Sequence, residues 1–78
     1  MATVLFFGPL GDLAHRRRDE LEGRTVAEII DEAHRRYGDS FAAAVESCAI
    51  WVNGEPVTYE ADVPENAEVA FLPPVSGG

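Results

Sequence analysis

The 78-residue sequence predicts an α+β fold, in which one main helix packs on one face of a mixed sheet of four to five strands. Three observations support this fold class. Apolar segments rich in β-forming residues lie near both ends of the chain. A single long amphipathic helix pattern lies between them, and a short hairpin signal follows that helix. Such a helix has one apolar face to bury, and the predicted sheet is the surface that can receive it.

The first strand is predicted over residues 3–7, an apolar run that ends at a Gly-Pro pair. Continuous apolarity is typical of a central strand covered on both faces. Residues 8–14 are predicted to form a loop that is anchored by Leu10 or Leu13. A second strand over residues 16–21 has a weak pattern and several charges, which places it near an edge of the sheet.

The clearest helix signal begins at Thr25, which with Glu28 forms the sequence pattern of a capping box. Apolar residues then recur at helical spacing and predict one buried stripe made of Val26, Ile29, Ile30, Ala33 and Tyr37. Acidic residues precede arginines by four positions twice, which predicts two exposed ion pairs, Asp31 with Arg35 and Glu32 with Arg36. Gly38 is a typical residue just past the end of a helix.

The second half of the chain predicts a hairpin. A short helical turn is expected over residues 40–45, and a strand is expected over residues 49–52. Asn53-Gly54 can supply the positive φ angles of a tight turn. The returning strand, residues 56–59, starts with a proline and should therefore lie at an edge or begin there.

The last predicted strand spans residues 68–72, with Val69 and Phe71 on one face. It follows a turn in which Asn66 is the residue best suited to a left-handed conformation. The complete order is strand, strand, helix, strand, short strand, strand. This order fits the β-grasp (ubiquitin-like) arrangement, in which the first and last strands run parallel at the centre of the sheet.

Composition excludes several classes of function. The net charge of −8 disfavours nucleic-acid binding and suits a basic protein partner. Acidic residues directly follow Arg16-Arg17-Arg18, which favours a solvated surface there. One cysteine, Cys48, excludes an internal disulfide, and with His15 and His34 it has no standard zinc spacing. No apolar run reaches membrane-spanning length and no leader pattern opens the chain, so we expect a cytosolic protein without a membrane partner.

Residues 1–72 are predicted to form the domain and residues 73–78 an extended, flexible tail. Pro73-Pro74 cannot continue a strand ladder and favours a stiff, extended backbone. Gly77 and Gly78 lack side chains, so they can enter a narrow tunnel in another protein. The α-carboxylate is then the functional group at the tip. It becomes reactive if an enzyme first converts it to an acyl adenylate with ATP, after which a sulfur donor can leave a thiocarboxylate.

Three stretches make the sequence similar to the MoaD/ThiS family of ubiquitin-like sulfur carriers, and nearest to molybdopterin synthase small subunits of the MoaD type. They are residues 4–8 (VLFFG), residues 52–57 (VNGEPV) and residues 68–78 (EVAFLPPVSGG). The turn before the last strand reads Glu-Asn-Ala-Glu where the family often has Asp-Gly-Asp-Glu. Trp51 also stands where the family often has a small or aliphatic residue, so it is either covered or part of an exposed apolar patch.

The resemblance implies a role for each residue of the ending. Gly78 would carry the adenylate and then the thiocarboxylate, and Gly77 would let it enter the active site of a partner. The docking surface would be formed by Phe71, Leu72, Pro73, Pro74, Val75 and Ser76. The implied partners are a ubiquitin-activating-type adenylating enzyme, a molybdopterin synthase large subunit and a sulfur donor protein. ATP and magnesium would be bound by the activating partner, and this chain would hold no cofactor or metal.

Three other functions remain open on the residues alone. The carrier could deliver sulfur to thiamine, cysteine or tRNA thiolation instead. The chain could be a protein modifier attached through Gly78, although the absence of lysine excludes lysine-linked chains of its own kind. It could also be an interaction module with an inert tail. An enzyme acting alone is disfavoured, because neither histidine has an evident acid or nucleophile at useful spacing.

Overall fold

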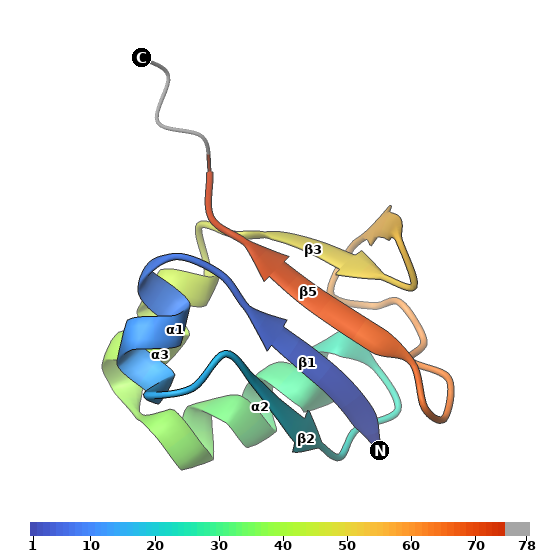
Figure 1. The fold of residues 1–78 in the computed structure, drawn as a ribbon. Helices are drawn as coiled ribbons and strands as arrows, with labels where there is room; N and C mark the ends of the chain where they lie inside the picture. Colours follow the sequence, from blue (N-terminus) through green and yellow to red (C-terminus); the bar gives the residue numbers. More distant parts are fainter. Residues whose placement is uncertain (75–78) are drawn as a thin grey trace.

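Figure 1 shows a twisted sheet with the helices gathered on one of its faces. The structure, a computed structural model, describes residues 1–74. Its elements, in chain order, are β1 (Ala2–Phe6), α1 (Pro9–Ala14), β2 (Arg18–Leu21), α2 (Val26–Tyr37), α3 (Asp39–Val45), β3 (Ala49–Val52), β4 (Glu55–Val57) and β5 (Glu68–Leu72). The predicted α+β class is confirmed.

The sheet order is β2-β1-β5-β3-β4, and only the central pair is parallel. β1 and β5 pair in parallel with Val4 opposite Val69, and all other neighbours are antiparallel. The prediction that the first and last strands run parallel at the centre is therefore confirmed. β2 and β4 lie at the two edges, as their charge and proline content predicted.

The core lies between the sheet and the helices. Alternate residues of the central strands point into it, as the period of two requires, and Val4, Val69 and Phe71 have no exposed surface. From the helical layer, Leu10 of α1, the apolar stripe of α2 and Phe41 of α3 fill the opposite side. The rings of Phe6, Tyr37 and Phe41 pack edge-on or tilted, with centroids 5.0–5.5 Å apart.

Helix α2 begins as predicted, but its polar contacts differ in two places. The Thr25 hydroxyl accepts a hydrogen bond from the backbone N–H of Glu28 at 3.3 Å. The Glu28 carboxylate, however, accepts from the N–H of Arg24 rather than Thr25, so the reciprocal half of the capping box is displaced by one residue. Arg36 pairs with Glu32 at 3.0 Å, as predicted.

The other predicted ion pair of α2, between Asp31 and Arg35, is wrong. Arg35 pairs with Glu32 at 2.9 Å, one turn away in the i,i+3 direction, and not with Asp31. Glu32 is mostly buried against the helix surface, with 20% of its side chain exposed, so its carboxylate can receive both arginines. Asp31 instead stays exposed at the rim of a surface hollow.

Two further expectations are corrected. Residues 8–14 were predicted to form a loop, but Pro9–Ala14 forms helix α1, with Leu10 as the buried anchor. The helix starts with Pro9 in its first turn, where a missing N–H is harmless. Strand β1 was predicted to be covered on both faces, yet Leu5 is only half-buried because no described element lies over that face.

The predicted turns are confirmed by their backbone angles. Asn53 and Gly54 have φ of 50° and 82° in the β3–β4 turn. Asn66 has φ of 63° before β5, which confirms the left-handed conformation predicted for it. These turns set the register that brings β5 between β1 and β3.

Candidate functional site

The predicted tail leaves the sheet beside the end of the first strand. Phe6 of β1 lies opposite Phe71 of β5, so both strands reach the same end of the sheet together (Figure 1). The turn after β1 then touches the start of the tail, since a Cβ added to Gly8 would lie 3.2 Å from Cγ of Pro73. The parallel pairing thus fixes where the tail begins.

The structure separates the predicted docking residues into three groups. Leu72 and Pro73 are half-buried, and Pro74 is exposed, so these three can meet a partner. Phe71 cannot, because its side chain is 0% exposed and faces the helices. The prediction that Phe71 lines the docking surface is therefore wrong, since the period of two in β5 directs it to the core. The other predicted site residues, Val75, Ser76, Gly77 and Gly78, lie outside the described residues.

The sheet face opposite the helices carries a row of apolar side chains, which we call the open face. Its members are the half-buried residues Leu5, Trp51, Ala70 and Leu72. They are neighbours in the sheet, because Ala70 lies opposite Leu5 on one side and opposite Trp51 on the other. Trp51 points away from the buried Ile50 and Val52 and is not covered by a helix. The patch leads along β5 directly to the tail.

Sequence reasoning missed two apolar residues of the surface near the tail, one on the open face and one beside it. Leu5 was assigned to a strand covered on both faces, although the alternation of β1 and β5 places it beside Ala70. Phe7, just past the end of β1, is 42% exposed, which is unusual for a phenylalanine. The apolar run of residues 3–7 contains both residues, and comparing it with the alternation of β5 could have identified them.

A cluster of polar contacts lies between β2 and α2. Asp19 of β2 accepts hydrogen bonds from the Tyr37 hydroxyl, from Arg36 at 3.0 Å and from the Glu20 N–H at 2.8 Å. Burial raises the pKa of the Asp19 carboxyl, but these hydrogen bonds and the nearby Arg16 charge outweigh burial and lower the pKa overall. Burial and the bond to Asp19 raise the pKa of Tyr37 to about 12. The cluster ties β2 to α2.

The single cysteine flanks the core. Cys48 is half-buried, and its Sγ donates a long hydrogen bond to the carbonyl oxygen of Ala44 at 3.4 Å. Burial raises the pKa of this thiol, which disfavours the reactive thiolate. Cys48 is therefore a small core-flanking residue.

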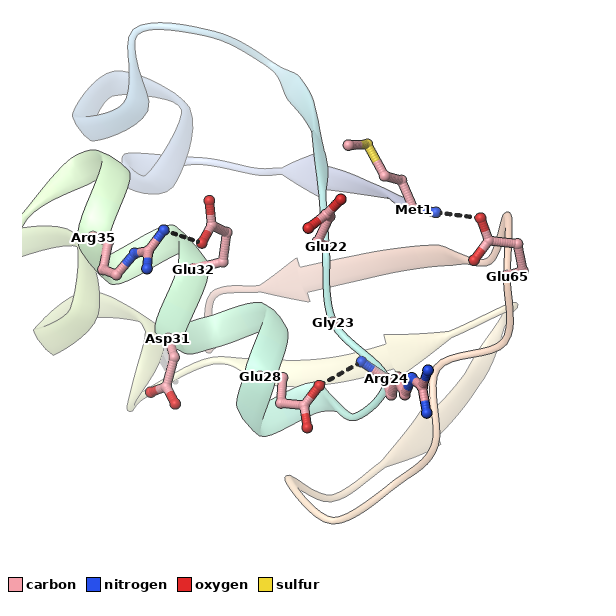
Figure 2. A pocket seen from close by; sticks show the side chains of 9 residues that line it. All are labelled: Met1, Glu22, Gly23, Arg24, Glu28, Asp31, Glu32, Arg35 and Glu65. Atoms are coloured by element: carbon pink, nitrogen blue, oxygen red, sulfur yellow. Dashed lines mark hydrogen bonds and ion pairs between the residues drawn. The ribbon is translucent and has the colours of Figure 1, made fainter.

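A large surface hollow, of about 750 Å³, lies at the other end of β1, away from the tail. Figure 2 shows that its walls come from Met1, the β2–α2 connection, helix α2 and Glu65. The Met1 amine pairs with Glu65 at 2.5 Å, and the Glu28 carboxylate is held by the backbone of Arg24. Within residues 1–74, no group of three or more potential ligand side chains is arranged to hold a metal ion.

Comparison with known proteins identifies the family. The sequence profile described as the ThiS family matches residues 4–78, which is nearly the whole chain. The chain belongs to the ThiS family. In this ThiS-family chain the matched region includes the open face, the exit of the tail and the final glycines.

Individual relatives agree with this assignment. The molybdopterin synthase sulfur carrier subunit of Haemophilus influenzae is 33% identical over 81 residues, with both chains covered completely. Among solved structures, a chain of the BexX/CysO complex of Amycolatopsis orientalis is 29% identical, with a TM-score of 0.87 and complete coverage of both chains. The putative molybdopterin converting factor subunit 1 of Pyrococcus furiosus is 25% identical, with a TM-score of 0.82 over 95% of this chain and 97% of that one.

Two features of this ThiS-family chain bear on its setting. None of the helices within residues 1–74 has the length and apolar character needed to cross a membrane. Of the two histidines, His34 pairs with Asp39 at the surface and His15 lies in the α1–β2 connection. The fold presents an apolar face that runs along β5 to Leu72 and the start of the tail.

Proposed function

We propose that this chain is a sulfur carrier for molybdopterin synthesis and acts as the small, sulfur-donating subunit of a molybdopterin synthase. The observation that carries the proposal is the full-length relationship to a molybdopterin synthase sulfur carrier subunit within the ThiS family. The arrangement of the open face beside the start of the tail supports it, because a carrier needs a surface for its partner next to its reactive end. The chain is not catalytic alone.

The chemistry takes place at the Gly78 carboxylate. An adenylating partner, which binds ATP and Mg²⁺, transfers AMP to this carboxylate and releases pyrophosphate. The persulfide of a sulfur donor protein then attacks the acyl carbon and AMP leaves. A second thiol of that donor reduces the resulting acyl disulfide, so that the donor ends as a disulfide and Gly78 as a thiocarboxylate. The thiocarboxylate is a better nucleophile than the acid, so it can transfer its sulfur in the active site of the large subunit. Gly77 keeps the segment thin enough to enter both partners.

The open face supplies the binding energy that holds the carrier while the tail reacts. Tryptophan is a typical anchor residue of protein interfaces, and the buried centre of an interface is more apolar than the rest of the protein surface. Here Trp51, Leu5 and Leu72 stand on one rigid sheet, so little conformational entropy is lost when a partner covers them. Leu72, Pro73 and Pro74 then guide the chain from this face toward the partner's active site.

The test is the intact mass of the purified chain after incubation with its host's adenylating enzyme, a sulfur donor, ATP and Mg²⁺. The expected result is a mass increase equal to replacing one oxygen by one sulfur. A variant lacking Gly78 serves as the control and should show no increase. An unchanged wild-type mass, with an adenylating enzyme shown to be active on another substrate, would contradict the proposal.

A second candidate is a carrier whose sulfur goes to an acceptor other than molybdopterin. The likeness to a chain of the BexX/CysO complex supports it, because that chain matches this one over its whole length and its complex is not named for molybdopterin synthesis. The thiocarboxylated chain can be mixed with the host's molybdopterin synthase large subunit and a pterin precursor. Formation of the dithiolene product supports the first candidate, and a thiocarboxylate that survives unchanged supports the second.

A further inference from the structure

The chain carries one strongly basic segment, although its net charge is −8. Arg16, Arg17 and Arg18 follow one another between α1 and β2, and all three are exposed. Arg16 pairs with Asp19 at 3.3 Å, but within residues 1–74 neither Arg17 nor Arg18 pairs with a carboxylate. Positive charge is thus concentrated at one place on an otherwise acidic surface.

This basic segment lines a surface hollow of about 610 Å³, which we call the basic hollow. It lies between the end of β1 and the α1–β2 connection, and its wall includes Phe7, Gly8, Asp12, His15, Arg16 and Arg17. The hollow therefore combines an exposed aromatic ring with two guanidinium groups and an imidazole. Asp12 is the one acidic side chain among its lining residues, so positive groups outnumber it.

The basic hollow borders the exit of the tail. Gly8, on its rim, is the residue whose added Cβ would lie 3.2 Å from Pro73. A protein that receives the tail and covers Leu72 must also pass over or beside this rim. The hollow is therefore part of the surface that a tail-binding partner reaches, whereas the acidic hollow of Figure 2 lies at the opposite end of β1.

We propose that the basic hollow binds an acidic segment of the adenylating enzyme that receives the tail, with Arg16 and Arg17 pairing with its carboxylates. This inference rests on the proposed function and names the chemistry of the partner at its site. Guanidinium groups suit this role, because their planar donors match a carboxylate in a two-point hydrogen bond. A positive site on a negative molecule also fixes the orientation of docking, since the reversed orientation places like charges together.

The test measures binding of the full-length chain to its host's adenylating enzyme by calorimetry, at about 50 mM and about 300 mM NaCl. The double substitution Arg16→Glu with Arg17→Glu should weaken binding roughly tenfold at low salt, because two charge pairs become repulsive. At high salt the difference should shrink. Arg24→Glu is the matched control, because it makes the same kind of charge change beside the other hollow and should alter affinity less than about twofold.

Two further variants keep the test decisive. Arg17→Glu alone leaves the Arg16–Asp19 pair in place, so it should weaken binding even if the double variant folds poorly. Replacement of both arginines by lysine keeps the charge and should weaken binding less than the glutamate pair does. Equal effects of Arg17→Glu and Arg24→Glu would overturn the inference, since they would show that only net charge matters.

The outcomes also separate this inference from the proposed function. If the wild-type chain gains sulfur at Gly78 and Arg17→Glu binds as tightly as wild type, the inference fails alone. If the wild-type chain does not bind the adenylating enzyme, both fail. A titration of the chain with inorganic phosphate tests whether the basic hollow binds phosphate instead of carboxylates. NMR shifts confined to residues 15–17 at sub-millimolar phosphate would overturn the acidic segment as the ligand and assign a phosphate group in its place.

Discussion

The Asp19 carboxylate collects more polar contacts than a surface ion pair normally has. Tyr37, Arg36 and the Glu20 N–H donate to it, and Arg16 stands 3.3 Å away. Only 13% of its side chain is exposed, so these contacts are shielded from water more than the exposed pairs of the chain. Because β2 is an edge strand with one neighbour, this cluster is a principal attachment of β2 to α2.

Asp19→Asn should therefore lower the free energy of unfolding at pH 7 by roughly 1–3 kcal/mol, since a charged acceptor of several hydrogen bonds is lost. The pKa of Asp19 is lowered from 3.8 in the folded chain, so its contribution is present above about pH 4 and is lost as pH falls through the folded pKa. Urea unfolding at pH 7 and pH 3 measures this. The gap between wild type and Asp19→Asn should narrow at pH 3, and an equal gap at both values would refute the assignment.

The Tyr37 hydroxyl makes the stabilisation by the same cluster depend on pH in the alkaline range. Its pKa is raised from 10.0 to about 12, so its contribution is complete below about pH 10 and is lost as pH rises toward 12. Tyr37→Phe is the matched control, because it keeps the ring contacts with Phe6 and Phe41 and removes only the hydroxyl. The variant should lack the alkaline loss that the wild-type chain shows in urea unfolding between pH 9 and pH 12.

At the scale of elements, one face of strand β5 packs into the core and the other face forms part of the open face. Val69 and Phe71 point into the core, and Ala70 and Leu72 point to the open face. A one-residue shift in register would exchange the two sets, so the Asn66 turn that begins the strand decides both stability and docking. The neighbouring strand β3 is divided in the same way, because Ile50 and Val52 point into the core and Trp51 lies on the open face.

Substitutions on the two faces should therefore separate folding from binding. Phe71→Ala should cost about 3–5 kcal/mol, which is most of the stability expected of a domain this small. Trp51→Ala should keep the fold and weaken binding to the partner by at least about tenfold, as the loss of a central tryptophan anchor usually does. Circular dichroism and calorimetric titration measure the two effects. A Trp51→Ala chain that unfolds as readily as Phe71→Ala would show that the open face belongs to the core.

Helix α1 shows where sequence reasoning reaches its limit. Six residues are too few for a helix to be stable by itself, and Gly11 lowers its propensity further, so local pattern favoured a loop. The helix forms because Leu10 and Ala14 are buried against the core, which is information held by the tertiary structure. Helix α2 is different, because its cap, its long apolar stripe and its terminal glycine all agree in the sequence.

The candidate site was predictable only where a local sequence pattern encodes it, as was true of the helices. The chemistry expected at the tail follows from a local motif, residues 68–78, that can be recognised without any structure. The open face and the basic hollow join residues from β1, β3, β5 and the α1–β2 connection, which are distant in sequence. Only the order β2-β1-β5-β3-β4 brings Leu5, Ala70 and Trp51 together. Phe71 was assigned wrongly because the motif of residues 68–78 indicates the family but not which of its side chains face the core.

At the scale of the whole molecule, charge opposes the fold. Fourteen acidic residues against six arginines leave a net charge of −8 on a domain with a radius of gyration of 11.3 Å. Self-repulsion of such a molecule decays within a Debye length of about 10 Å at 0.1 M salt, which is comparable to its size. The ion pairs seen among residues 1–74 are mostly exposed, so each contributes at most about 1 kcal/mol and several contribute less.

The melting temperature should therefore rise by about 3–6 °C between about 10 mM and about 300 mM NaCl, because relief of repulsion outweighs weakening of those pairs. A thermal scan in NaCl and in an uncharged osmolyte of equal osmolarity distinguishes screening from solvent exclusion. A melting temperature that falls as NaCl increases would mean that the ion pairs of Arg16, Arg35 and Arg36 stabilise the fold more than the surplus of carboxylates destabilises it.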